Sequence, residues 1–212
     1  MQRTATAEKK SAGAGRFSAK YIAFTGIFGA ISAVLMIFDF PLPFVPSFYK
    51  FDFSEVPVLI AAFALGPLSG VFAELIKILI HLMVRGTQTA GIGEAASFLI
   101  GCSFVLPAAL IYMKHKTRKN ALIGMIVGTV TIALVGALVN AYILLPAYAA
   151  AFNMPIETLV GMGTAINPSI KSIFTFVLLA VAPFNLLKGA VVSFVTYLLY
   201  KRVSGLIHKA AA

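Results

Sequence analysis

Charged residues are scarce in this sequence, and their scarcity is the first constraint on what the chain can be. Only 11% of the 212 residues are charged and 60% are hydrophobic, whereas soluble domains have about 25% charged and about 45–50% apolar residues. The seven acidic residues are too few to cover a water-soluble protein of this size. The composition therefore excludes a soluble enzyme and indicates an integral membrane protein surrounded largely by lipid.

Other absences narrow the function. Cys102 is the sole cysteine and lies in an apolar run, so an internal disulfide is impossible and the redox compartment stays open. The sequence has no metal-binding cluster, no catalytic triad, no phosphate-binding glycine loop and no nucleotide motif. It also lacks the internal repeat of many secondary transporters. A membrane chain with neither an ATP site nor a repeat is best interpreted as one subunit of a larger assembly.

Basic residues set the expected orientation. The net charge is +10, but the basic residues gather in short loops rather than in one patch, which argues against nucleic-acid binding. They cluster before residue 21, at 114–119 and after residue 200. If the N-terminal segment is cytoplasmic, six helices return the other two clusters to the same side, as the positive-inside rule requires. We expect a multi-pass protein of the cytoplasmic membrane with both termini in the cytoplasm.

Long apolar runs predict about six transmembrane helices, because a hydrocarbon core of about 30 Å requires roughly 20 apolar residues per helix. The predicted helices cover residues 21–38, 54–66, 67–84, 94–113, 121–152 and 183–206. The second and third are divided at Gly66-Pro67, since a Gly-Pro pair breaks a helix. Pro183 opens the last helix because proline suits a first turn, which leaves 170–182 as an apolar cap outside it. Residues 153–170 are expected to form a loop with short turns.

The predicted architecture is an all-α integral membrane protein with one domain at 20–207 and cytoplasmic tails at 1–19 and 208–212. The basic N-terminal tail is expected to be disordered, and it is not a signal peptide because a full-length apolar run follows without a cleavage site. After the first helix, residues 40–53 contain three prolines, which exclude a helix and predict an extended extracellular loop. Its many aromatic side chains either line a small-molecule cavity or form an interfacial belt.

Ionisable residues inside apolar runs indicate a functional site by default. Glu74, Lys77 and His81 are spaced three and four apart and so share one helix face, where an internal Glu74–Lys77 pair is favoured over a proton relay. Asp52 and Glu55 lie at a helix start, where carboxylates complement the macrodipole. Either Asp52 or Ser54 can cap this helix, and capping and a binding role are left as equal alternatives.

A second group of polar residues lies in the last two predicted helices. Lys188 has no acidic residue within a turn in sequence, and Asn185 lies three residues before it on the same face. Asn140 lies deep in another apolar run and needs a buried partner. Lys188 could simply extend toward the membrane interface, but the three residues together favour a ligand that presents several carbonyl-type acceptors.

Small residues line one face of the first predicted helix. Ala23, Gly26, Ala30 and Ala33 recur at spacings of three and four, and small residues let membrane helices approach closely. Spacing alone leaves packing within the protein and docking to a partner equally open.

Several segments resemble the riboflavin-specific substrate-binding subunits of energy-coupling factor (ECF) transporters. The segments are FPLPFVPSFYKFDFSEVPVLIAAFALGPLSGVFAELIK, GEAASFLIG at 93–101, NAYILLPAYA at 140–149 and PFNLLKG at 183–189. They cover nearly the whole chain after residue 20, in the family's order. The resemblance implies a six-helix membrane subunit that captures riboflavin from outside, as a transported ligand rather than a cofactor. It also implies partners, namely a transmembrane coupling subunit and two ATPase subunits.

The resemblance assigns residues to these roles. Asn140, Asn185 and Lys188 would hydrogen-bond the isoalloxazine ring, and the loop around 40–53 would close the site. The implied binding set is Tyr49, Lys50, Phe51, Asp52, Glu94, Asn140, Asn185 and Lys188. The face with Gly26 and Ala30 would meet the coupling subunit. This chain has Ile78 and Ser97 where the family often has asparagine, which affects affinity or specificity if either position touches the ligand.

Two rival functions remain. One is a membrane-embedded enzyme, for which Glu74, His81 and Glu94 would be the catalytic candidates, although no motif places them together. The other is the same transport fold with a different ligand, such as another vitamin or a purine.

Overall fold

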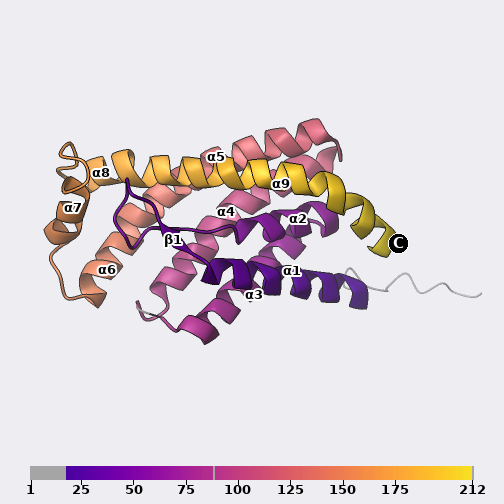
Figure 1. Cartoon of the computed structure of the whole chain (residues 1–212), viewed down its shortest axis with the longest axis horizontal. Helices are drawn as coiled ribbons and strands as arrows, with labels where there is room; N and C mark the ends of the chain where they lie inside the picture. The colour runs from indigo at the N-terminus through magenta and orange to yellow at the C-terminus, as the bar shows by residue number, and fades with distance from the viewer. Residues whose placement is uncertain (1–17, 88, 212) are drawn as a thin grey trace, which may run out of the picture.

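The structure is a bundle of helices that run mostly along one long axis (Figure 1). It is a computed structural model that describes residues 18–87 and 89–211, so most of the expected N-terminal tail lies outside the described residues. The helices are α1 (Ala19–Ile37), α2 (Glu55–Leu65), α3 (Pro67–Arg85), α4 (Ile92–Lys114), α5 (Arg118–Val139), α6 (Leu145–Ala151), α7 (Ile156–Thr164), α8 (Ile173–Phe176) and α9 (Ala182–Ala211). Two π-helical segments, η1 (Asn140–Leu144) and η2 (Val177–Val181), join α5 to α6 and α8 to α9.

Five helical segments of the described chain are long and apolar enough to cross a membrane. They are Ala19–Ile37, Pro67–Arg85, Ile92–Lys114, Arg118–Ala151 and Ile173–Tyr200. The prediction of about six therefore differs at one place, α2, whose 11 residues reach about 16 Å at 1.5 Å per residue. That is about half of a 30 Å hydrocarbon core.

The break between α2 and α3 is confirmed at the predicted dipeptide. Gly66 has φ 110° and Pro67 occupies the first turn of α3. Glycine adopts this positive φ without steric cost, and proline at the first turn loses no helical hydrogen bond. The chain therefore reverses within two residues, and α3 packs back against α2 and α1.

The first helix packs on α3 through a face different from the predicted one. A Cβ on Gly29 would lie 2.7 Å from the Ile76 side chain, so this glycine permits the close approach of the two helices. Thr25, Ser32 and Ala33 are buried on the same side. Ala33 was expected on the docking face, but it is fully buried inside the bundle and is removed from that face.

Pro146 and Pro183 lie inside continuous helical segments that contain a π turn, and Pro107 lies inside α4, which has none. Pro146 follows η1 by two residues, and Pro183 follows η2 in the same way. Proline removes one N–H donor and its ring clashes with the carbonyl four residues earlier, and the wider π turn accommodates both effects. The predicted start at Pro183 and the cap at 170–182 were wrong, because residues 173–182 are a continuous helical extension of α9.

The segment 153–170 also differs from its prediction. It contains α7, a helix of nine residues with Leu159 and Val160 buried against the bundle. Its two glycines suggested a loop, but both Gly161 and Gly163 lie within the helix, and Gly163 packs closely against Phe176. Tertiary packing thus overrides the low helix propensity of glycine.

The proline-rich segment contains no helix, as predicted, but its extended backbone is confined to two short strands and turns lie between them. Strands β1 (Phe40–Pro41) and β2 (Lys50–Phe51) pair antiparallel, with Phe40 opposite Phe51. The loop between them packs its aromatic side chains against α6, α7 and α8, in a cluster that includes Tyr49, Phe51 and Phe176. A separate core lies around Phe63 and Phe104 in the middle of the bundle, and the candidate site lies between these two clusters.

Candidate ligand-binding site

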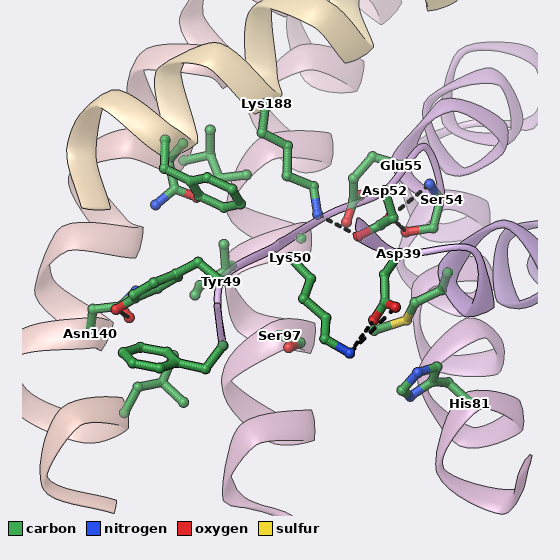
Figure 2. A pocket seen from close by; sticks show the side chains of 18 of the residues that line it. Asp39, Tyr49, Lys50, Asp52, Ser54, Glu55, His81, Ser97, Asn140 and Lys188 are labelled. Carbon is green, nitrogen blue, oxygen red and sulfur yellow. Dashed lines mark hydrogen bonds and ion pairs between the residues drawn. The ribbon is translucent and has the colours of Figure 1, made fainter. Parts of the chain in front are cut away.

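A cavity of about 220 Å³ lies where the loop after β2 enters the bundle (Figure 2). Its walls come mainly from the loop and from α3, α4, α5, η1 and α9. A second cavity of about 200 Å³ adjoins it and shares the residues Met36, Asp39, Lys50, His81, Ser97 and Tyr148. The two cavities together form a polar cleft within a bundle whose outer surface is largely apolar.

The short α2 is what brings the loop into the bundle. Residues 52–54 are extended or bent backbone, and Asp52 and Ser54 are 5% and 1% exposed. Non-helical backbone at membrane depth is tolerated only where it is buried in protein or lines a cavity, and this segment does both. Because α2 begins only at Glu55, the segment before it is free to line the site.

Lys188 points from α9 toward this extended segment (Figure 2). Its Nζ lies 2.9 Å from Asp52 Oδ2, and Asp52 Oδ1 accepts hydrogen bonds from the Ser54 backbone N–H at 2.8 Å and the Ser54 hydroxyl. Burial alone would raise the pKa of the Asp52 carboxyl, but the charges of Lys188 and Lys77 and these hydrogen bonds lower it to about 2. The acidic partner of Lys188, absent from its neighbours in sequence, thus comes from the loop.

Two asparagines contribute amide groups from the neighbouring helices. Asn140 Nδ2 donates to the Gly136 carbonyl at 2.7 Å and Asn185 Nδ2 donates to the Val181 carbonyl at 3.0 Å. Each amide nitrogen carries two hydrogens, so each has one further N–H to offer. Gly136 also allows the helices to approach, because a Cβ there would lie 2.7 Å from Asn185 Nδ2.

The π segments position both asparagines. Asn140 is the first residue of η1, and Asn185 bonds the carbonyl of Val181, the last residue of η2. A π turn leaves carbonyl groups outside the regular α-helical hydrogen-bond pattern, and such turns are frequent at functional sites. Here the asparagine side chains satisfy backbone carbonyls while facing the cavity.

Aromatic rings lie beside these polar groups. The Tyr49 hydroxyl donates to Asn140 Oδ1 at 2.5 Å, and its ring lies 5.7 Å from that of Phe184. Phe48 and Tyr148 meet edge to face at 5.6 Å. Burial raises the pKa of Tyr49 well above its ordinary value, so its hydroxyl stays protonated and neutral. The site therefore presents flat apolar surfaces next to fixed hydrogen-bond groups.

Charged groups of opposite sign meet at the mouth of the cleft. Asp39 lies between Lys50, at 3.2 Å, and Arg85, at 3.4 Å. Arg85 also donates to the Ile37 carbonyl at 2.6 Å, which ties the end of α3 to the end of α1. Glu94 accepts a hydrogen bond from the Thr87 hydroxyl at 2.9 Å and lines the adjoining cavity.

The floor of the cavity contains buried charge. Glu55, Lys77 and Gly101 line it, and Glu74 lies behind them. The predicted Glu74–Lys77 pair is confirmed at 2.5 Å, and Glu55 joins it at 2.8 Å. Glu74 lines neither cavity, whereas His81 lines both and Glu94 lines the second. The three residues considered as catalytic candidates for an embedded enzyme thus do not line one cavity together.

The structure brings most of the predicted site residues to one cavity. Those that line the first cavity are Tyr49, Lys50, Asp52, Asn140, Asn185 and Lys188. Phe51 does not line the cavity. Its ring packs against those of Phe40 and Phe53, with ring centroids 5.5 and 5.3 Å away, and so helps to hold the loop in place. Of the two positions that depart from the family pattern, Ser97 lines both cavities, whereas Ile78 is buried and lines neither.

Sequence reasoning missed some residues that line the cavity. Tyr148 lies eight residues after Asn140, about two helical turns, and this spacing could have identified it. Phe184 adjoins Asn185 in sequence, but the direction of its ring depends on η2. Ser54 was weighed only as a helix cap.

The small-residue face of α1 is open in the structure. Ala23 and Ala30 are exposed, and no described atom lies within 4 Å of a Cβ built on Gly26. Ile22 and Ile27, which are 60% and 53% exposed, flank this face. The role of these residues in docking stays a prediction.

Comparison with known proteins gives consistent matches. A family model described as "ECF transporter, substrate-specific component" matches residues 20–200. The chain is 34% identical to "Riboflavin transporter RibU" of Staphylococcus aureus (strain TCH60), covering 85% of this chain and 88% of the relative. It is 30% identical to "Riboflavin transporter FmnP" of Bacillus subtilis (strain 168), with 85% and 90% covered.

A solved structure also matches over most of the fold. That structure is described as "Structure and mechanism of the S component of a bacterial ECF transporter". It superposes with a TM-score of 0.69 at 32% identity and covers 89% of this chain and 97% of the solved one.

Proposed function

The chain belongs to the family of substrate-specific components of ECF transporters, and on this premise we propose that it binds riboflavin in the described cleft for uptake into the cell. The observation that carries the proposal is the convergence of Lys188, Asn185 and Asn140 beside the aromatic loop. The chain is then a transport subunit that binds its substrate and does not transform it. Riboflavin is the transported ligand and not a cofactor.

The chemistry of the cleft suits a flavin. The isoalloxazine ring is flat, neutral and edged with carbonyl oxygens and ring nitrogens. An ammonium and two amide groups supply donors for those acceptors, and charge-assisted bonds from Lys188 are the strongest of them. Tyr49 and Phe184 offer apolar surface to the ring, and the polar mouth around Asp39 and Lys50 suits the hydroxyls of the ribityl chain.

Six membrane passes with both termini in the cytoplasm form part of the proposal. The start of α1 and the end of α9 lie at the same end of the bundle (Figure 1). α2 and the extended segment before it together run from the loop end of the bundle to the start of α3. The positive-inside rule then assigns the basic segment 114–119 to the cytoplasm and the loop and α7 to the outside. The cleft accordingly opens toward the exterior of the cell membrane.

Transport requires partners that supply energy. The proposal includes a transmembrane coupling subunit and two ATPase subunits, because the chain has no nucleotide motif. The open face of α1, formed by Ala23, Gly26 and Ala30, is the proposed contact for the coupling subunit. Small residues at that face allow the close helix approach on which association in lipid depends.

Titration of the purified protein with riboflavin tests the proposed ligand. We expect quenching of flavin fluorescence with 1:1 stoichiometry, and retained flavin would give the purified protein a yellow absorbance. Competition with a purine and with a second vitamin distinguishes the rival ligands. An absence of quenching at micromolar concentrations, or complete displacement by a compound without a flavin ring, rules the assignment out.

A further inference from the structure

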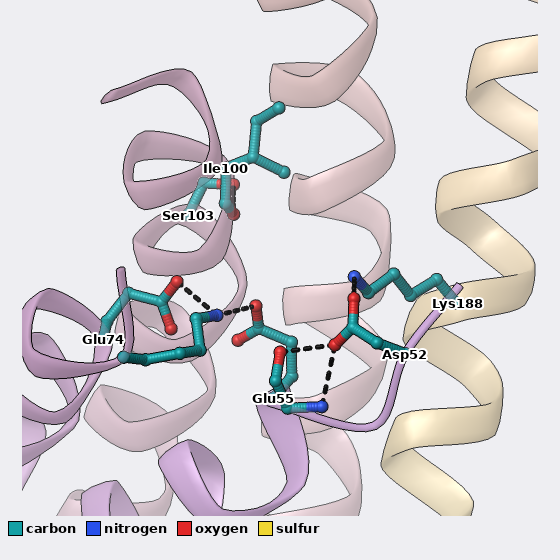
Figure 3. A network of polar contacts seen from close by, with 8 residues as sticks. Asp52, Glu55, Glu74, Ile100, Ser103 and Lys188 are labelled. Carbon is teal, nitrogen blue, oxygen red and sulfur yellow. Dashed lines mark hydrogen bonds and ion pairs between the residues drawn. The ribbon is translucent and has the colours of Figure 1, made fainter. Parts of the chain in front are cut away.

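Five ionisable side chains meet at the ligand cavity, four in its wall and one behind it, and their charges do not cancel if all five are ionised. Figure 3 shows the carboxylates Asp52, Glu55 and Glu74 and the cation Lys188. The second cation is Lys77, which contacts Glu55 and Glu74. Three negative groups against two positive groups leave one excess negative charge if all five are ionised. All of them lie inside a bundle that is surrounded by lipid.

The contacts divide these groups into a balanced pair and an unbalanced triad. Lys188 and Asp52 form one ion pair at 2.9 Å. Lys77 Nζ lies 2.8 Å from Glu55 Oε1 and 2.5 Å from Glu74 Oε1, so one ammonium faces two carboxyl groups. The excess charge therefore belongs to Glu55 and Glu74.

Neither glutamate has enough partners to hold a full charge in this position. The side chains of Glu74, Lys77 and Glu55 are 0%, 3% and 5% exposed. Glu55 Oε2 and Glu74 Oε2 have no hydrogen-bond partner among the described residues. An uncompensated buried charge is strongly unfavourable, and such a group takes up a proton instead.

Among the residues that the structure describes, the other elements packed around the triad add no compensating charge. From α4, the nearest titratable group is the thiol of Cys102, which is neutral. Lys188 acts on Glu74 from α9, but it already pairs with Asp52. The remaining positive charge near both glutamates is that of Lys77.

The space around the carboxyl groups favours a proton over a metal ion. Gly101 of α4 presents its backbone to the two glutamates, and a methyl group there would collide with Glu74 Oε1 and lie 3.1 Å from Glu55 Oε1. The Lys77 ammonium occupies the position between the two carboxyl groups. A further cation with its own ligands therefore has no room between them.

We propose that Glu74 is a resident proton site and carries a neutral carboxylic acid at neutral pH. Glu74 is the member that holds the proton because its side chain is 0% exposed and lines neither cavity, whereas Glu55 borders the polar cavity. The triad then consists of one ammonium, one carboxylate and one neutral acid. The charges of the triad then cancel.

Infrared spectroscopy of the ligand-free protein tests the proposal directly. A protonated carboxyl has a C=O stretch above the amide and carboxylate bands, and the stretch shifts in D₂O. We expect this band in wild-type protein in a detergent that has no ester carbonyl. Glu74→Gln, which keeps the neutral charge and the shape, should remove the band, and Glu157→Gln in exposed α7 should leave it.

Thermal stability supplies a second readout that does not depend on the ligand. Because unfolded wild-type protein releases the proton in neutral solution, its stability should fall as pH rises from 6 to 9, and Glu74→Gln should flatten this slope. Absence of the infrared band in wild type, or its survival in Glu74→Gln, overturns the proposal. An equal slope in both proteins overturns it as well.

Discussion

Replacement of Lys188 by alanine probes both the ligand and the loop, because this ammonium faces both. The substitution removes one charge-assisted donor from the cleft. Loss of such a bond in a buried site costs about 1.5–3 kcal/mol, which corresponds to a roughly ten- to hundredfold weaker Kd for riboflavin.

The structure adds a second effect of the same substitution. Asp52 loses its partner at 2.9 Å and keeps only the hydrogen bonds from Ser54. Breaking a fully buried ion pair from one side costs about 3–5 kcal/mol of stability. Since 15% of the Lys188 side chain is exposed, we expect a loss at or below the lower end of that range.

A comparison of three variants separates the two effects. Lys188→Ala should lose both affinity and thermal stability, whereas Lys188→Ala with Asp52→Asn should regain stability and stay weak in binding. Lys171→Ala, at an exposed position, should change neither. Affinity is measured by quenching of flavin fluorescence and stability by thermal unfolding in detergent.

Two results would refute this reasoning. If Lys188→Ala binds riboflavin within about twofold of wild type, the ammonium does not contact the ligand. If the double variant regains full affinity, Lys188 acts only by holding Asp52 and the loop in place.

Three further outcomes follow from the structure. Gly101→Ala should lower the unfolding temperature because a Cβ there would displace the Glu74 carboxyl from its buried contact with Lys77. Gly161→Ala, with open space around it, should not, and equal unfolding temperatures would contradict the packing. Ala30→Trp should bind riboflavin normally in detergent yet fail to support uptake in cells that contain the coupling subunit and ATPases; a parallel loss of binding would make this face internal packing. The pKa of Asp52 is lowered to about 2 from an ordinary 3.8, so its ionised form stabilises the fold above about pH 4. This stabilisation is lost as pH falls toward 2, and an Asp52→Asn protein with the same acid transition would disprove the contribution.

Periodicity and length were sufficient to predict most of the helices. The break at Gly66-Pro67 and the non-helical loop at 40–53 were predictable because proline and glycine restrict or free the backbone locally. The helical course of residues 173–182 could not be predicted from the sequence. It requires a π turn before Pro183, and that turn depends on contacts along the whole helix. The same holds for α7, whose glycines are tolerated because the helix packs against Phe176.

The candidate site was predictable where its members share a helix and unpredictable where they do not. Asn185 and Lys188 are three residues apart, so one face contains both. Asp52 lies 136 residues from Lys188, and no local pattern links them. Phe51 was assigned to the site with its neighbours, but alternation along a strand turns its ring to the opposite side from Lys50.

The π segments imply that the number of residues in each helical segment, and not only side-chain identity, determines the direction in which the binding side chains point. Removing one residue from η2 would let a regular helix close in its place. Every residue beyond the deletion would then rotate by about 100° relative to the bundle, and Asn185 and Lys188 would leave the cleft together. Such a deletion would preserve helix content and hydropathy while abolishing ligand recognition. Single-residue gaps at η1 or η2 would therefore distinguish chains that bind this ligand from chains that only share the fold.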